Sequence, residues 1–171
     1  YYNILIGEGK EEKEVIEVLK AKSRDNGRSP MQWNGDENGG FTAGNPWIAA
    51  ASNYSDINVS RALEDKASIF YYYKKLISLR KNKEIIAEGS YKPILEEDDK
   101  VFGYIRDYKG ERLIVLSNFY GQEAIINLSK ELFQEYKLIE PIIFNYQKAP
   151  ELKESMVLRP FEAVAFYLVN N

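Results

Sequence analysis

The sequence contains no cysteine and no histidine. The absence of cysteine excludes disulfide bonds, thiolate metal sites and cysteine nucleophiles, and it is typical of a cytoplasmic protein. The absence of histidine removes the most common general base and metal ligand. Chemistry performed by this chain alone would have to use carboxylates, lysine, tyrosine or hydroxyl groups, and we expect no bound metal and no cofactor.

Neither sign of charge is in large excess, and long apolar runs are missing. The 26 acidic and 23 basic side chains give a net charge of −3, which provides no electrostatic reason to expect nucleic acid or an anionic membrane as a partner. No apolar run approaches the roughly 18 residues of a membrane helix. The first residues, YYNILIGEGK, also lack the features of a signal peptide, and we expect a further segment to precede Tyr1.

What is present in the first half is helical periodicity in two segments, residues 10–22 and 66–82. The first has an apolar stripe that includes Val15, with acidic residues early and lysines late, as the helix dipole prefers. The second has Asp65 as its expected N-cap. Its apolar stripe consists of Ile69, Tyr73, Leu76 and Ile77. We expect Tyr73, rather than Tyr71 or Tyr72, to be the packed member of the tyrosine run.

Between these two helices the periodicity disappears. Pro30 and Pro46 disfavour helical conformation at the residues before them. Glycines at 35, 39, 40 and 44 allow turns with positive φ. We predict a loop of about 35 residues with a short helical turn near residues 59–63. Loops of this length in a compact domain are usually functional or disordered, and we expect Trp33 and Trp47 to anchor this one by burial.

From residue 85 onward the period changes to two, which indicates strands. The candidate strands are residues 85–95, 100–108, 111–118, 123–127, 138–144, 154–158 and 162–169. Lys109-Gly110 is typical of a two-residue hairpin turn, and the acidic run at 96–99 of a solvated hairpin tip. Together these features predict an antiparallel β-sandwich. We place a domain boundary near residue 84, which gives domains 1–84 and 85–171.

Three ordered motifs carry a resemblance to a known family. The strings SRDNGRSPMQWNGDENGGFTAGNPWI, NYSDINVSRAL and SIFYYYKKLISLRK resemble the C-terminal third of bacterial α-glucosidases of the α-amylase family, in the oligo-1,6-glucosidase, dextran glucosidase and trehalose-6-phosphate hydrolase group. The resemblance covers essentially all 171 residues. It implies an α+β fragment: the end of a (β/α)₈ barrel, with its long loop and last helices, followed by the sandwich. Residues 1–65 would follow the eighth barrel strand.

The resemblance also implies an activity, which is retaining hydrolysis of short α-glucosides such as isomalto-oligosaccharides. The family's catalytic carboxylates match positions before Tyr1, so we expect no catalytic residue in this chain and no activity for the chain alone. Asp36 and Glu37 do not substitute for them, and Arg24 and Asp25 are expected to form a local helix cap. Arg28 matches the family arginine that contacts the terminal glucose and is our predicted substrate-binding residue.

The expected partners are an α-glucoside oligosaccharide and the preceding barrel of the same polypeptide. Without that barrel, the apolar faces of residues 10–22 and 66–82 should make the chain self-associate. Two alternatives stay open: a trehalose-6-phosphate hydrolase, and a free-standing carbohydrate-binding or interaction module. The module would use aromatic residues of the β domain, about half of which strand alternation should bury. They are Phe102, Tyr104, Tyr108, Phe119 and Tyr120.

Overall fold

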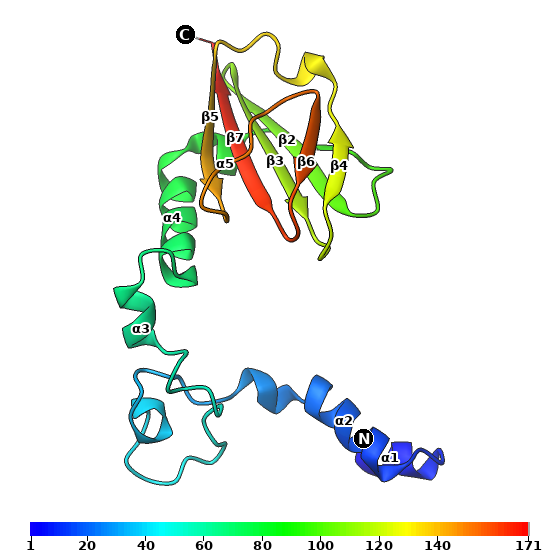
Figure 1. Ribbon diagram of the computed structural model, residues 1–171, viewed down its shortest axis with the longest axis vertical. Coiled ribbons are helices and arrows are strands. Elements are labelled where there is room, and N and C mark those ends of the chain that lie inside the picture. Colours follow the sequence, from blue (N-terminus) through cyan, green and yellow to red (C-terminus); the bar gives the residue numbers. More distant parts are fainter. Residues whose placement is uncertain (171) are drawn as a thin grey trace. The chain divides into compact units, whose positions relative to one another are not determined.

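The computed structural model describes residues 1–170, which form two compact units, the first from Tyr1 to Phe70 and the second from Tyr71 onward (Figure 1). The change from one unit to the other falls inside helix α4 (Ile69–Asn82). The domain boundary near residue 84 stays a prediction. None of the helices among the described residues is long and apolar enough to cross a membrane.

The first unit begins with two helices, α1 (Tyr2–Gly7) and α2 (Glu12–Lys22). The predicted helix at 10–22 is confirmed as α2, and Val15 on its apolar stripe is fully buried. After α2 the chain makes the 3₁₀ helix η1 (Arg24–Gly27), in which the Asp25 N–H donates to the Ser23 hydroxyl at 3.3 Å. The Asn26 amide donates to the Lys20 carbonyl at 2.7 Å. The end of α2 is therefore capped locally, as predicted, although Asn26 and not Arg24 or Asp25 provides the bond to the helix.

The long loop contains only short regular pieces. They are the 3₁₀ helix η2 (Glu37–Gly40) and helix α3 (Val59–Glu64), which confirms the predicted turn near residues 59–63. The predicted N-cap of the next helix is wrong, because α4 begins at Ile69 and not at 66. Asp65 instead follows the end of α3, and its carboxylate accepts the Ala67 N–H at 2.8 Å. This local bond delays the start of α4 by several residues.

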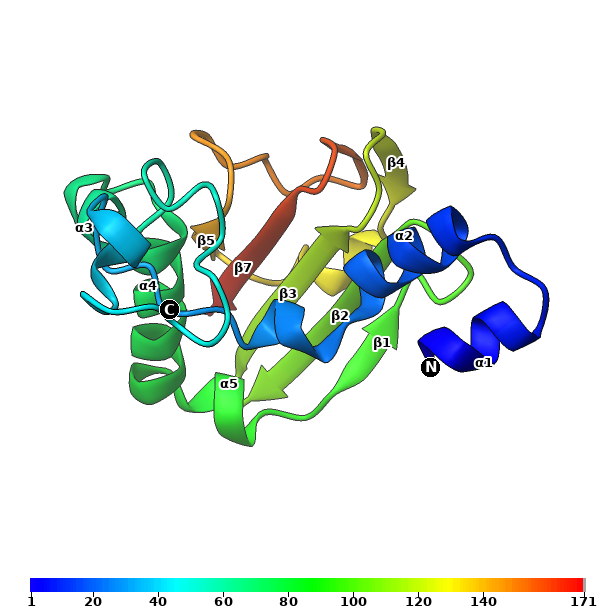
Figure 2. The same ribbon diagram turned by 90° about the horizontal axis from the view of Figure 1, so that it is seen from below.

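The second unit contains a five-stranded antiparallel sheet in the order β1-β2-β3-β7-β5 (Figure 2). Its strands are β1 (Lys92–Ile94), β2 (Val101–Tyr108), β3 (Glu111–Asn118), β7 (Ala163–Val169) and β5 (Leu138–Phe144). A two-stranded sheet pairs β4 (Ala124–Asn127) with β6 (Ser155–Leu158), and η3 (Lys130–Leu132) follows β4. The predicted antiparallel C-terminal domain is confirmed, and six of its strands lie within a residue or so of their predicted limits.

The main core lies between the two sheets. Inward residues of both sheets form it, because alternate side chains on a strand point to opposite faces. The largest fully buried members are Phe166, Ile114, Leu116, Ile126, Leu158 and Leu168. A second, smaller cluster lies on the other face of the five-stranded sheet, where α4 and α5 (Glu84–Glu88) cover part of it. The sheet thus has apolar residues on both faces.

The predicted strand at 85–95 is wrong over its first half, which forms helix α5 instead. Its Ile85 side chain is fully buried against the outer face of the sheet. The Arg106 guanidinium holds the end of this helix by donating to the Ile85 carbonyl at 3.1 Å and to the Gly89 carbonyl at 2.6 Å. A short apolar run fits a strand or a helix equally well, so tertiary contacts decide between them.

Two predicted turns are confirmed. Lys109 and Gly110 both have positive φ, 50° and 83°, as a two-residue hairpin turn of this type requires. In the acidic run, the Asp98 carboxylate accepts the N–H groups of Lys100 and Val101 at 2.8 and 2.9 Å. Asp98 therefore shapes the hairpin between β1 and β2.

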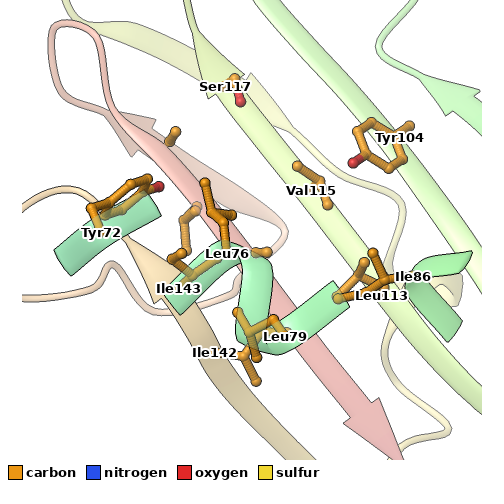
Figure 3. Close-up of a pocket in the computed structure, with 13 residues that line it drawn as sticks. Tyr72, Leu76, Leu79, Ile86, Tyr104, Leu113, Val115, Ser117, Ile142 and Ile143 are labelled. Carbon is orange, nitrogen blue, oxygen red and sulfur yellow. The ribbon is translucent and has the colours of Figure 1, made fainter. Parts of the chain in front are cut away.

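The prediction for the tyrosine run is wrong. Tyr72, not Tyr73, packs against the outer sheet cluster, and burial raises the pKa of the Tyr72 phenol. Tyr73 is 63% exposed. Helix α4 therefore turns the face with Tyr72 and Leu79 to the sheet (Figure 3) and leaves Ile69, Tyr73 and Ile77 of the predicted stripe exposed.

Candidate functional site

The loop between α2 and α3 is organised around two residues, Gln32 and Trp33. The Gln32 carbonyl accepts the Val59 N–H at 2.9 Å, and the Trp33 carbonyl accepts the Ser60 N–H at 3.0 Å. The Trp33 N–H in turn donates to the Gly39 carbonyl at 2.7 Å. Main-chain bonds therefore join the middle of the loop to the start of α3.

Side-chain bonds add to this frame. The Gln32 amide donates to the Ile57 carbonyl at 2.7 Å and to the Asn53 side chain at 3.3 Å. Gly39 has a φ of +67°, and a Cβ there would lie only 3.2 Å from the Gln32 Cα, so glycine is needed at this position. Gly39 and its neighbour Gly40 use the positive φ that the sequence allows, whereas the glycines at 35 and 44 have ordinary φ values.

Arg28 lies directly after η1 at the start of this organised loop. Its side chain is 47% exposed, and its guanidinium is 3.9 Å from the Asp25 carboxylate, at the outer limit for an ion pair. An exposed pair at this distance contributes little stability. Most of the guanidinium donors therefore stay open to a ligand, while η1 and Pro30 on either side restrict the backbone.

A hollow of about 390 Å³ lies next to Arg28, beginning at Ser29. Its lining is mainly apolar and comes from both ends of the loop, from α3 and from the start of α4. The lining residues are Ser29, Pro30, Met31, Gln32, Ile57, Asn58, Val59, Ala62 and Phe70. Arg28 thus directly precedes, in the sequence, the first residue of a surface that combines apolar contact with a few polar groups.

Two acidic side chains near Arg28 and in the loop, Asp25 and Asp36, have local partners. The Asn34 amide donates to the Asp36 carboxylate at 2.8 Å, and Asp25 lies beside Arg28. Within residues 1–170, no group of three or more acidic side chains is placed to hold a metal ion. The structure therefore brings Arg28 together with Asp25 alone, and its predicted contact with a sugar stays a prediction.

The two tryptophans of the loop are not buried as expected. Trp47 is 91% exposed and Trp33 is 50% exposed. Met31 and Phe41 beside them are also about half exposed. The loop fixes its own backbone but provides no wall for these side chains, so it presents an apolar surface that the described residues leave uncovered.

Strand alternation does not bury half of the five aromatic residues considered as sugar platforms, because Phe102, Tyr104 and Tyr108 share one face of β2 and the other two follow the end of β3. Tyr104 and Tyr108 are partly covered, whereas Phe102, Phe119 and Tyr120 are about half exposed or more. These three exposed rings line an open hollow of about 550 Å³ that also contains the 98–100 segment. A sugar-binding role for the β domain therefore has three candidate rings.

Comparison with known proteins matches two successive family descriptions to the chain. Residues 2–89 match "Alpha amylase, catalytic domain", and residues 101–165 match "Alpha-amylase SusG C-terminal domain". The oligo-1,6-glucosidase of Bacillus cereus is 44% identical over 98% of this chain and 30% of its own length. The trehalose-6-phosphate hydrolase of Bacillus subtilis is 42% identical, again over 98% of this chain and 30% of its own length.

The fold comparison agrees. The crystal structure of Bacillus licheniformis trehalose-6-phosphate hydrolase has a TM-score of 0.93 and 45% identity over 99% of this chain and 30% of that chain. The chain thus spans about 30% of the length of the curated relatives cited above. It belongs to the α-amylase family, with the helical end of the catalytic domain followed by an antiparallel C-terminal domain.

Proposed function

We propose that this chain is the C-terminal part of a cytoplasmic α-glucosidase and completes a (β/α)₈ barrel that precedes it in the same polypeptide. The observation that carries the proposal is the loop at residues 23–58. Its backbone is fixed by its own hydrogen bonds, yet Arg28, Trp33 and Trp47 are left exposed. Such an arrangement fits the rim of an active site whose other walls come from elsewhere.

In this proposal the catalytic carboxylates belong to the preceding barrel, where one acts as the nucleophile and one as the acid/base. Arg28 contributes binding. Its planar guanidinium can donate to a sugar hydroxyl and to a barrel carboxylate at the same time, and its weak pair with Asp25 can be given up at small cost. The chain alone then binds no substrate productively and has no activity.

The proposed substrates are short α-glucosides such as isomalto-oligosaccharides. Trehalose-6-phosphate is the second candidate, because relatives named for either activity match this chain to a similar extent, at 44% and 42% identity. The choice between them depends on contacts to the second sugar or its phosphate, and we assign those contacts to the preceding barrel.

Two chimeras test the proposal. In one, this chain replaces the matching C-terminal segment of the Bacillus cereus oligo-1,6-glucosidase; in the other, it replaces that of the Bacillus subtilis trehalose-6-phosphate hydrolase. We expect each chimera to hydrolyse its parent's substrate, isomaltotriose or trehalose-6-phosphate, because the barrel that selects the substrate comes from the parent in each case. The proposal is wrong if both chimeras fold but hydrolyse neither sugar.

Arg28 is tested in the active chimera with a matched control in the same turn. Arg28→Ala should lower kcat/KM by roughly 10- to 100-fold, because a hydrogen bond to a charged group contributes about 1.5 to 3 kcal/mol. Arg24→Ala, in η1, should leave kcat/KM close to that of the unchanged chimera. Equal effects of the two substitutions would show that Arg28 acts through the fold of the turn.

The isolated chain is tested separately. We expect the purified 171-residue chain to release no p-nitrophenol from p-nitrophenyl α-glucoside above a buffer blank. The carbohydrate-module alternative makes a separate prediction, since the exposed rings at 102, 119 and 120 would then bind sugar. Calorimetric titration of the chain with isomaltotriose measures this directly, and binding that Phe119→Ala abolishes would favour the module.

A further inference from the structure

Three Asn-Gly sequences lie close together in the first unit, at residues 26–27, 34–35 and 38–39. An asparagine before a glycine can lose its side-chain amide without an enzyme, because glycine has no Cβ to shield its main-chain nitrogen from the asparagine side chain. The reacting groups are the side-chain carbonyl of the asparagine and the N–H of the glycine. Since the local sequence is the same in all three, the fold decides which of them reacts.

The fold protects the sequence at residues 38–39. The Asn38 amide donates to the Thr42 carbonyl at 3.2 Å and to the Gly44 carbonyl at 3.1 Å. The Gly39 N–H donates to the Asp36 carbonyl at 2.9 Å. Both the side chain and the attacking nitrogen are therefore occupied by other bonds.

The sequence at residues 26–27 is protected in another way. It lies in η1, whose turn fixes the backbone. The Asn26 amide donates at 2.7 Å to the Lys20 carbonyl, six residues earlier, so the side chain is held back toward α2. Reaction at this site would first have to break the bond that caps the helix.

The sequence at residues 34–35 has the opposite arrangement. The Asn34 side-chain oxygen accepts the Asp36 N–H at 3.0 Å, and the Asn34 amide donates to the Asp36 carboxylate at 2.8 Å. The first bond makes an Asx turn, which folds the asparagine side chain over the peptide before its partner. That peptide carries the Gly35 N–H. Among residues 1–170 this N–H has no hydrogen-bond acceptor, and Gly35 is exposed.

These contacts are the ones that the reaction needs. The Asp36 N–H stabilises the negative charge that develops on the Asn34 side-chain oxygen when the Gly35 nitrogen attacks. The Asp36 carboxylate bonds to the nitrogen that leaves and is placed to relay a proton to it. The attacking N–H gives up no bond to the described chain. Three successive residues thus supply the reacting carbonyl, the nucleophile and the groups that assist them.

We propose that Asn34 deamidates spontaneously in the folded protein and is the main site of this modification, with water as the only co-reactant. The Gly35 nitrogen loses its proton and forms a bond to the side-chain carbonyl carbon of Asn34. The bond from that carbon to the amide nitrogen breaks, so that ammonia leaves and a succinimide ring remains. Water then opens the ring to aspartate or isoaspartate, and no group is oxidised or reduced. The modification goes beyond the proposed function and does not depend on it.

The products should loosen the loop. The aspartate form places a carboxylate where the amide donated, beside the Asp36 carboxylate, and the two like charges repel. The isoaspartate form adds a carbon to the main chain directly after Asn34. The N–H groups of Trp33 and Asn34 both donate to the Gly39 carbonyl, at 2.7 and 3.2 Å, and a longer main chain disturbs this geometry. Both products therefore weaken the frame that joins the middle of the loop to α3.

The test compares the folded chain with the unfolded chain. The 171-residue chain is kept at mildly alkaline pH, either in buffer or in guanidinium chloride, in water enriched in the heavy isotope of oxygen. Peptide mapping by mass spectrometry measures the label that each asparagine takes up. In the folded chain, Asn34 should react roughly tenfold faster than Asn26 or Asn38. In the unfolded chain the three rates should become similar, because only the shared local sequence remains.

Three variants of the folded chain separate the contacts. Gly35→Ala should slow labelling at Asn34 roughly tenfold, because its methyl group shields the nitrogen. The alanine fits the fold, since its Cβ would lie 3.7 Å from the nearest neighbouring atom, the Ser55 carbonyl oxygen. Asp36→Asn keeps the main-chain N–H but removes the carboxylate, and should slow labelling several-fold. Glu37→Gln is the matched control, because it removes the next carboxylate of the loop and should leave the rate unchanged.

Two results would overturn the inference. One is equal labelling of the three asparagines in the folded chain, and the other is slower labelling of Asn34 in the folded chain than in the unfolded chain. Equal effects of Asp36→Asn and Glu37→Gln would also count against it, because the reaction would then not use the turn at Asp36. The readout is a covalent change in the isolated chain, so an inactive chimera would count against the proposed function but not against this modification.

Discussion

Glu162 has the most completely buried carboxylate among the described residues, with no exposed surface at all. Arg159, three residues earlier in the turn between β6 and β7, provides its partners. The Arg159 N–H donates to it at 2.8 Å, the guanidinium Nε donates at 3.0 Å, and the second guanidinium nitrogen binds the other carboxylate oxygen. The Glu162 carbonyl also accepts the Asn118 N–H at 2.8 Å, which connects this turn to the end of β3. Glu162→Gln keeps the shape and removes the charge.

The cost follows from these contacts. Breaking a buried ion pair typically costs about 3–5 kcal/mol, but the Arg159 side chain is 36% exposed, so water can compensate part of its lost pairing. The glutamine also keeps one acceptor oxygen. We expect Glu162→Gln to lower the free energy of unfolding by about 2 kcal/mol, which shifts the midpoint of a domain of this size by roughly 10 °C.

The pH dependence provides an independent check. Burial raises the pKa of the Glu162 carboxyl, but the hydrogen bonds and the charge of Arg159 lower it by more, so the pKa lies below its usual value. A lowered pKa stabilises the fold above the unfolded-state pKa of about 4.3, and this stabilisation is lost as the pH falls through the folded-state value. The difference between wild type and Glu162→Gln should therefore be constant near neutral pH and shrink in acid.

The assay is urea and thermal denaturation followed by circular dichroism between about pH 3 and 8, a range that spans the carboxyl titration. Glu151→Gln is the matched control, because its pair with Lys153 at 2.8 Å is exposed on both sides, and we expect it to have no measurable effect. The reasoning would be refuted if the two glutamine variants were equally stable at neutral pH, or if the deficit of Glu162→Gln grew toward acid pH.

Three further predictions concern other parts of the chain. Gly40→Ala should loosen the loop and speed its proteolysis, because the new Cβ would lie 2.3 Å from the Asn34 side-chain oxygen at a φ of +67°. Burial and a neighbouring carboxylate raise the pKa of Tyr167 to about 12. A spectrophotometric titration should therefore show one tyrosine that ionises only near pH 12, and this late ionisation should be absent in Tyr167→Phe. The stability that depends on the neutral Tyr167 phenol is lost as the pH rises above about 10. The isolated chain should self-associate in light scattering, and Tyr73→Ser with Ile77→Ser should reduce it, since both side chains are exposed on α4.

The strands were predictable because their pattern is local. Along β2 and β3 the residues alternate between the core and the outer face, and Lys109-Gly110 can form only a tight turn between them. Period two therefore located these elements to within a residue. The same rule failed for α5, where the isoleucines at 85 and 86 are bounded by a glycine at 89 and fit either structure. The deciding contact, Arg106 to the Gly89 carbonyl, joins residues 17 positions apart and leaves no periodic trace in the sequence.

The choice of Arg28 as the candidate site residue rests only on its motif, and its role stays a prediction. Composition and spacing do not distinguish Arg28 from any other surface arginine, and the bonds that organise its loop depend on long separations, such as the 25 residues between Gln32 and the Ile57 carbonyl. Burial of Trp33 and Trp47 was predicted wrongly for a related reason, because hydrophobicity indicates that a side chain needs cover but not whether this chain provides it.

Helix α4 was hard to predict for two reasons: its periodicity is ambiguous, and one of its apolar faces has no cover within the described residues. Its sequence has two apolar stripes, one with Tyr72 and Leu79 and one with Tyr73 and Ile77, and helical periodicity alone cannot rank them. The sheet beneath accepts the first stripe because β3 and β7 present apolar residues on their outer face. A helix that is apolar on two sides needs two partners, and only one of them lies within residues 1–170. The exposed stripe with Tyr73 and Ile77 is therefore the surface of α4 that we expect to pack against the barrel of the proposed function.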